Sequence, residues 1–396
     1  MSWDFKTLDE LGKVARGKSK HRPRNDKRLF GGIYPFIQTA DVKKANFYIY
    51  EYSETYNEIG LAQSKLWDAG TLCITIAANI ADTGILSMPA CFPDSIMGFI
   101  PYDGISDVRF IKYCFDILQR KCKQISQGTA QDNLSWEKLS TIKFPAPPLK
   151  IQCRIAEVLS RYDSLIENYQ KQIKLLEEAA QRLYKEWFVD LRFPGYENTK
   201  IVDGVPEGWE KKEINEFISI LSGYAFKSSS FVEDGDYKIV TIKNVQDGFF
   251  DGKNLSHIRE IPNKMPKHCF LTTGDLLLSL TGNIGRVCMV IGNNYLLNQR
   301  VAKIESVFPA FAYCLFRSEN LFTSINNLAN GAAQQNVSPI KIGTLKIVVN
   351  NEIISKFEKV VGNIRNQILV LYSQIEELTE ARDRLLPKLM SGEIEI

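Results

Sequence analysis

Two long stretches of the chain repeat apolar residues with an alternating four-three spacing, which is typical of a coiled-coil seam. They occupy residues 149–190 and 350–396. Each predicts a long helix, and the first stripe spans about 48 Å at 1.5 Å per residue. Seam positions in one stretch match those in the other at an offset of 202, and they are Ile155, Leu159, Ile166, Ile173, Leu176, Leu183, Phe357, Val361, Ile368, Ile375, Leu378 and Leu385.

Two such helices most simply bury their stripes against each other, and the repeat alone permits a parallel or an antiparallel pair. The linker at 191–206 allows the second copy to be inverted, which would give an antiparallel pair and an approximate twofold axis. Arg382 occupies a seam position of the second stretch, and Pro387 is expected to end or kink that helix.

The rest of the chain also consists of two tandem copies. Residues 128–135 recur as 331–338 at an offset of 203, and the strand-like run 72–76 recurs as 276–280 at an offset of 204. Strand-like runs alternate with Gly, Asn and Asp turns and short helical patches in both copies. We therefore predict an α+β protein of two tandem repeats, each a mixed α/β domain followed by a long helix. The expected segments are domain 1–148, helix 149–190, linker 191–206, domain 207–349 and helix 350–396.

The overall composition is uninformative, but the distribution of charged residues along the chain is not. A net charge of +3 gives no signal for nucleic acid, but residues 16–28 hold seven Lys or Arg against one Asp. This segment is either a solvated loop or a DNA contact. The amino-terminal residues lack an apolar signal region, and no uncharged stretch reaches the roughly 18 residues that span a bilayer. We therefore expect a cytoplasmic protein.

The candidate catalytic and metal-binding motifs lack the flanking elements or the number of ligands that such sites need. Gly12 to Ser19 match a phosphate-binding loop, but no apolar strand precedes them and Pro23 follows where the helix should continue, so we expect a basic turn. The cysteines are scattered, and the pair His268-Cys269 is too few ligands for zinc. We find no methyltransferase motif, glycine-rich cofactor loop or nuclease carboxylate cluster, which disfavours a fused modification enzyme or nuclease.

Several features together resemble the specificity subunit of type I restriction-modification systems. They are the repeated Gly-x-x-Gln-x-Asn-Leu/Val-Ser element, the apolar strand and turn that follow it, the long heptad helix, and the ending Leu-Leu-Pro-Lys-Leu-Met-Ser-Gly-Glu-Ile at 385–394. The resemblance covers essentially the whole chain. One departure is visible, since many relatives carry Glu-Gln after the turn where this chain has Ile151-Gln152 and Glu352-Ile353.

The resemblance implies a non-catalytic subunit whose two target-recognition domains each read one half of a bipartite, asymmetric sequence in double-stranded DNA. It implies two modification subunits that bind S-adenosylmethionine and methylate adenine, and restriction subunits that use ATP and Mg²⁺, so this chain would hold no cofactor or metal. The alternative from another class is a coiled-coil scaffold without a DNA role, which salt-dependent binding to duplex DNA would exclude.

Candidate DNA contacts follow from charge and from the repeat. The first domain offers Lys18, Lys20, Arg22, Arg24, Lys27, Arg28 and Asn79, and the second offers Tyr224, Lys227, Lys243, Asn244, Asn283 and Arg286. The repeated polar turn contributes Gln131, Asn133, Gln334 and Asn336, which could equally stabilise the turn itself. Lys and Arg on phosphates would supply affinity, and side chains at base edges would supply specificity.

Overall fold

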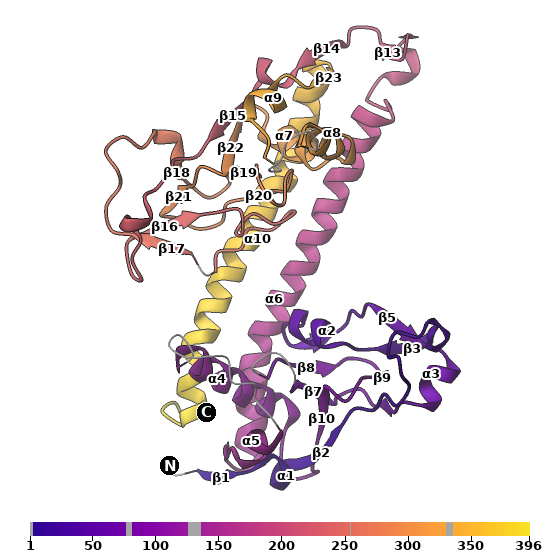
Figure 1. The fold of residues 1–396 in the computed structure, drawn as a ribbon, viewed down its shortest axis with the longest axis vertical. Coiled ribbons are helices and arrows are strands. Elements are labelled where there is room, and N and C mark those ends of the chain that lie inside the picture. Colours follow the sequence, from indigo (N-terminus) through magenta and orange to yellow (C-terminus); the bar gives the residue numbers. More distant parts are fainter. Residues whose placement is uncertain (1–2, 77–80, 126–135, 254, 330–335) are drawn as a thin grey trace. The chain divides into compact units, whose positions relative to one another are not determined.

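A computed structural model of the chain describes residues 3–76, 81–125, 136–253, 255–329 and 336–396. The described chain divides into two compact units, shown in Figure 1. Unit 1 combines residues 1–168 with residues 376–396, and unit 2 comprises residues 169–375. Both long helices therefore contribute one part to each unit.

Unit 1 builds a mixed α/β domain on two main sheets. Their strand orders are β2-β10-β7-β8-β4 and β5-β3-β9-β6, and a short pair, β1-β11, completes the unit. The strands are β1 (Asp4–Lys6), β2 (Gly12–Arg16), β3 (Phe30–Phe36), β4 (Tyr48–Ile49), β5 (Glu54–Tyr56), β6 (Leu66–Trp67), β7 (Leu72–Thr75), β8 (Thr83–Leu86), β9 (Ala90–Cys91), β10 (Ile96–Pro101) and β11 (Phe144–Ala146). The short helices are α1 (Leu8–Leu11), α2 (Thr39–Lys44), α3 (Glu58–Ala62), α4 (Val108–Ile125) and α5 (Trp136–Thr141).

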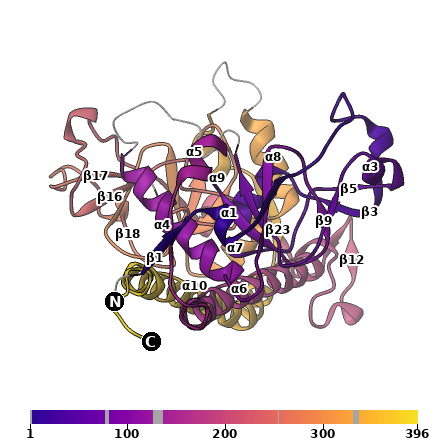
Figure 2. The same cartoon turned by 90° about the horizontal axis from the view of Figure 1, so that it is seen from below.

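Unit 2 repeats this plan, with sheets β15-β22-β19-β20 and β17-β16-β21-β18 and a short pair β14-β23. The strands are β12 (Ile201–Val202), β13 (Val205–Pro206), β14 (Glu210–Glu213), β15 (Ile218–Ser222), β16 (Tyr237–Val240), β17 (Ser256–Ile258), β18 (Phe270–Leu271), β19 (Leu276–Ser279), β20 (Val287–Met289), β21 (Tyr295–Leu297), β22 (Val301–Ser306) and β23 (Lys346–Val349). The short helices are α7 (Pro309–Phe316), α8 (Glu319–Ala329) and α9 (Pro339–Gly343). Both views show β16, β17 and β18 grouped together (Figures 1 and 2).

The matching sheet orders confirm the predicted pair of mixed α/β domains. The predicted strand-like runs become β7 and β19, and both strands are buried at every position, as expected of continuous apolar runs. One local expectation was wrong. Residues Gly12–Arg16 form strand β2, antiparallel to β10, rather than a basic turn, because Val14 and Ala15 pack against two different hydrophobic cores of the unit.

The two long helices are α6 (Leu149–Tyr184), which continues into a π-helical turn at Lys185–Val189, and α10 (Asn351–Ser391). α10 does not end at Pro387, contrary to one of the alternatives that the sequence offered. Leu386, Leu389 and Met390 are buried in the core of unit 1. We attribute the continuation of the helix to this packing, which offsets the backbone hydrogen bond that proline cannot make.

Seven of the twelve seam residues are buried and the other five are partly buried, but helix against helix is not their only contact. In unit 1, Ile155 and Leu159 share one core with Leu386 and Leu389 of α10 and with Phe110 of α4. The stripe therefore packs on the facing helix and on its own α/β domain together. The sequence predicted that the two stripes bury each other, and the structure adds a second contact, between each stripe and the α/β domain of its unit.

In unit 2 the corresponding part of α6 packs against the first part of α10. The rings of Tyr184 and Trp187 lie 6.1 and 5.7 Å from that of Phe357, which is early in α10. Tyr372 is later in α10, and Glu177 is earlier in α6 than Tyr184. Burial raises the pKa of Tyr372, and the nearby carboxylate of Glu177 raises it further. Residues that come later in α6 thus meet residues that come earlier in α10. Within this unit the two helices run antiparallel.

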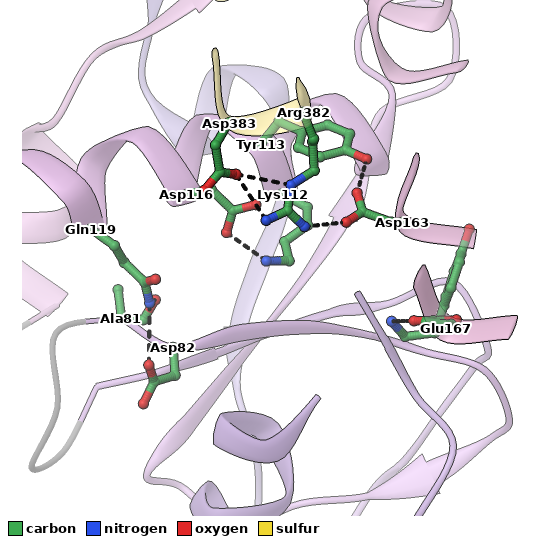
Figure 3. Close-up of polar contacts among 11 residues, drawn as sticks. Ala81, Asp82, Lys112, Tyr113, Asp116, Gln119, Asp163, Glu167, Arg382 and Asp383 are labelled. Atoms are coloured by element: carbon green, nitrogen blue, oxygen red, sulfur yellow. Dashed lines mark hydrogen bonds and ion pairs between the residues drawn. The ribbon is translucent and has the colours of Figure 1, made fainter. Parts of the chain in front are cut away.

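A buried ionic cluster joins α4, α6 and α10 inside unit 1 (Figure 3). Arg382, the charged residue at a seam position, pairs with Asp163 of α6, whose other carboxylate oxygen accepts a hydrogen bond from the hydroxyl of Tyr113. Beside them, Lys112 pairs with Asp116, and burial raises the pKa of that carboxyl group. A buried charge at one seam position tolerates only the register that supplies its partner, so this cluster fixes how α6 and α10 align within the unit.

Unit 2 has a related cluster built from different residues. Tyr313 of α7 donates a hydrogen bond of 2.7 Å to Glu177 of α6, and Arg317 pairs with the same carboxylate at 2.8 Å. Tyr113 and Tyr313 each begin a Tyr-Cys pair, so the repeat preserves the tyrosine while the cation comes from α10 in unit 1 and from the domain in unit 2.

Candidate DNA interface

The basic segment of unit 1 follows strand β2 and is largely exposed. Lys18, Lys20 and Lys27 extend into solvent, and none of them has an ion-pair partner within the described ranges. Their backbone is nevertheless well anchored, since the amide of Lys18 donates to Phe92 and that of Lys20 to Gln63. Three ammonium groups are thus presented from a fixed loop, as a phosphate contact requires.

The arginines of the same segment are held by carboxylates. Arg28 forms an ion pair with Asp26. Arg24 forms an ion pair with Asp94 at 2.7 Å, and Arg22 lies 3.8 Å from the same carboxylate. Hydrogen bonds from Arg28, and then from His21, lower the pKa of Asp26 well below its usual value. The guanidinium groups are therefore oriented but partly neutralised, and the three lysines carry most of the uncompensated charge.

In unit 2 the predicted residues fall into an exposed and a structural group. Lys227, Lys243 and Asn283 are exposed, and Arg286 is partly exposed and donates to the side chain of Gln246. Asn244 does not fit a DNA contact, because it is 3% exposed. We withdraw it as a candidate.

The side-chain bonds of Asn244 explain its burial. Its carbonyl oxygen accepts hydrogen bonds from the backbone and hydroxyl of Thr241, and its amide donates to the carbonyl of Asp251. The repeat partner Asp41 accepts in the same way from the backbone of Gln38 at 2.8 Å. Both residues therefore stabilise an equivalent turn.

Tyr224 is half-buried, with its ring 5.1 Å from that of Phe226. Asn336 bonds the hydroxyl of Thr281 at 2.9 Å, which supports the turn-stabilising alternative for this position. Four other candidates lie outside the described residues, and they are Asn79, Gln131, Asn133 and Gln334.

Each unit also contains a hollow among these residues. The hollow of unit 1 has a volume of about 720 Å³, and Arg24, Asn25, Lys27, Phe30 and Gln38 are among its lining residues. That of unit 2 has a volume of about 290 Å³ and is lined by Ile239, Thr241, Ile242, Lys243, Asn244, Ser256, Asn298 and Arg300.

The sequence reasoning missed Asn298 and Arg300. Their counterparts in unit 1 are Pro93 and Ser95, at the offset of 205 that relates β10 to β22, and no sequence pattern singled out either pair.

The described part of the chain offers no sign of other chemistry. In it, no group of three or more His, Cys, Asp or Glu residues is placed to hold a metal ion. Cys269 is buried and His268 bonds the carbonyl of Ser222 at 2.9 Å, which gives this pair a structural role. Among the helices of the described residues, none has the length and apolar character needed to cross a membrane.

Two similar α/β units, each with exposed cations and a part of both long helices, suit a protein that recognises DNA at two places. The sequence profile of the family described as "Type I restriction modification DNA specificity domain" matches residues 1–178 and 206–367. The chain therefore belongs to this family. It is a specificity subunit, the non-catalytic component that determines the DNA target sequence, and the cofactors reside in the other subunits.

Relatives of similar length support this assignment. The specificity subunit of the type I restriction enzyme MjaIX from Methanocaldococcus jannaschii is 27% identical over 100% of this chain and 94% of its own length. That of MjaVIII from the same organism is 28% identical over 100% of this chain and 93% of its own. A crystal structure of a type I restriction-modification S subunit from M. genitalium has the same fold, with a TM-score of 0.57 and 16% identity over 98% of this chain and 96% of that one.

Proposed function

We propose that this chain directs its complex to a bipartite and asymmetric sequence in double-stranded DNA, with each unit reading one half-site. The observation that carries the proposal is that the two units have corresponding strand orders but different side chains in their candidate loops, which are the basic residues 18–28 in unit 1 and residues 227–236 in unit 2. The shared strands would place the two recognition surfaces alike, and the different side chains would give them different base preferences. An asymmetric target follows.

The partners would be two modification subunits, which bind S-adenosylmethionine and methylate adenine, and restriction subunits that use ATP and Mg²⁺ to translocate and cleave DNA. The doubled architecture supports two modification subunits, because a repeated chain offers a repeated surface to two copies of one partner. The assembled complex would act in the cytoplasm, on the DNA of its own cell and on incoming DNA.

An exchange of one domain tests the division of labour. Residues 1–148 would be replaced by the matching residues of a relative with a known target, and the methylated adenines of the host genome would then be mapped by sequencing. We expect one half-site to change and the other to remain. The matched control replaces residues 207–349 and should change the opposite half-site. A change in both halves from either exchange would contradict the proposal.

A further inference from the structure

The two hollows occupy the same place in the repeated fold. In unit 1, Gln38 and Thr39 lie just after strand β3, separated from it by Ile37, and Ser95 lies between β9 and β10. The repeat offset of 203 matches Gln38 and Thr39 to Thr241 and Ile242. The offset of 205 that relates β10 to β22 matches Ser95 to Arg300, and all three matched residues line the hollow of unit 2. β3 is parallel to β9, as β16 is to β21. Part of the lining of each hollow thus lies beyond the carboxyl ends of a parallel strand pair, a position where open α/β sheets commonly bind ligands.

Strand register gives two more matched positions. Phe36 of β3 faces Glu54 of β5 across the sheet, and Ile239 of β16 faces Ser256 of β17 in the same way. All four residues line their hollows. Five of the eight residues that line the hollow of unit 2 therefore have counterparts in unit 1, so the hollow is part of the repeated fold and not an accident of one surface.

A matched glycine shapes the neighbouring chain in each unit. A Cβ added at Gly17 would lie 2.3 Å from the carbonyl oxygen of Pro93, and one added at Gly223 would lie 2.2 Å from that of Asn298. No other residue permits this close approach of two backbones. Pro93 and Asn298 line the hollows, so the same close contact between a glycine and a neighbouring backbone shapes one side of each hollow.

The chemistry that both hollows share is cationic. Arg24 and Lys27 line the first, and Lys243 and Arg300 line the second, in each case beside hydroxyl or amide groups. The two units are proposed to read different base sequences. A feature that both retain therefore suits what the two half-sites have in common, which is the phosphate backbone.

We propose that each hollow holds one phosphate group of the DNA backbone and anchors its unit on the duplex independently of sequence. This inference rests on the proposed function, since it assigns a phosphate contact within each recognition domain. It separates the anchoring residues of the hollows from the neighbouring exposed residues that would reach base edges.

The hollow of unit 2 is the stronger anchor. In unit 1, Arg24 is already bonded to Asp94, and Glu54, which accepts a hydrogen bond of 2.6 Å from Gln38, places a carboxylate in the lining. Unit 2 has Ser256 at the position of Glu54, and within the described residues neither Lys243 nor Arg300 has an ion-pair partner. Removal of the two cations should therefore weaken DNA binding more in unit 2 than in unit 1.

The test uses the full chain assembled with its modification subunits. The variant Lys243→Ala/Arg300→Ala is compared with Lys341→Ala/Lys346→Ala, which removes the same charge from exposed residues of unit 2 that do not line the hollow. Binding is measured from low to moderate salt on two duplexes, one containing the target found by methylation mapping and one with that target scrambled. Melting temperatures confirm that both variants remain folded.

We expect the hollow variant to bind both duplexes roughly 10- to 100-fold more weakly, as loss of a charge-assisted contact predicts. The slope of log affinity against log salt should become shallower by about 1, as expected for one phosphate. The methylated sequence should not change. Equal behaviour of the hollow variant and its control would overturn the inference, and so would an altered base preference at one half-site.

A second measurement locates the phosphate. Neutral methylphosphonate groups are placed one at a time along the half-site, and one position should weaken binding of the wild-type complex but not of the hollow variant. The absence of such a position would contradict the phosphate anchor while leaving target recognition intact. A wild-type complex that shows no preference for its target would instead refute the proposed function and this inference with it.

Discussion

The most informative perturbation of the fold is removal of Arg382, the cation in the seam of α10. Its side chain is 22% exposed and pairs with Asp163, whose side chain is 4% exposed. In Arg382→Leu the carboxylate of Asp163 keeps the hydrogen bond from the hydroxyl of Tyr113 but loses its cation, and it remains buried. Breaking a buried pair in this way costs about 3–5 kcal/mol, because one charge is left uncompensated.

The expected size of the effect can be measured by calorimetry. For a unit of roughly 190 residues, each kcal/mol shifts the melting temperature by about 2–4 °C, so unit 1 should melt roughly 6–20 °C lower. The double variant Asp163→Leu/Arg382→Leu should recover most of this loss, because replacing both members of a buried pair by apolar residues is often neutral or stabilising.

Arg384→Leu is the matched control. Arg384 lies two residues further along α10, is 78% exposed and pairs only with the exposed Glu380 among the described residues, so its loss should cost less than about 1 kcal/mol. The reasoning fails if Arg382→Leu and Arg384→Leu melt alike. It also fails if the double variant is no more stable than Arg382→Leu.

Three further outcomes are expected. Insertion of four residues between Gln172 and Ile173 adds about 6 Å of helix, so the preferred spacer between half-sites should lengthen by one or two base pairs in methylation maps; a folded, active variant that keeps the parental spacer would show that the helix does not set it. Gly223→Ala should destabilise unit 2 by about 1–3 kcal/mol in denaturant unfolding, because its Cβ would collide with the backbone of Asn298, whereas Gly362→Ala in α10 should stabilise it by about 0.5–1 kcal/mol. The purified chain alone should neither methylate nor cleave DNA nor hydrolyse ATP, and turnover that a point substitution in this chain abolishes would contradict that expectation.

The repeat made much of the fold predictable. Matched runs at a nearly constant offset indicated two copies of one domain, and the four-three spacing indicated both long helices, because these are local periodicities that a sequence displays directly. What surrounds each stripe is a tertiary property. Ile155 has the same spacing whether it packs on a second helix or on Phe110, so the shared core of unit 1 could not be anticipated from the pattern.

The candidate site was less accessible to sequence reasoning. Asn244 matched a polar position of the first copy, but its burial and its bonds to the neighbouring turn depend on how the chain folds back at Asp251. Arg300 was overlooked because it follows a strand without any motif. It joins Lys243 at one hollow only because β21 lies parallel to β16. Recognition of such a site requires the strand order, which the repeat implied but did not specify.

The composition of unit 1 has a consequence for biosynthesis. Its core includes Leu386, Leu389 and Met390, and its buried Asp163 depends on Arg382, so the domain that is synthesised before unit 2 is completed by residues that are synthesised after unit 2. Until residues 376–396 have been synthesised, the nascent domain exposes apolar surface and an unpaired carboxylate, whereas residues 169–375 can already close into unit 2. A premature stop at position 376 would therefore damage unit 1 and spare unit 2, and chaperones would be needed most by residues 1–168 while they wait for residues 376–396.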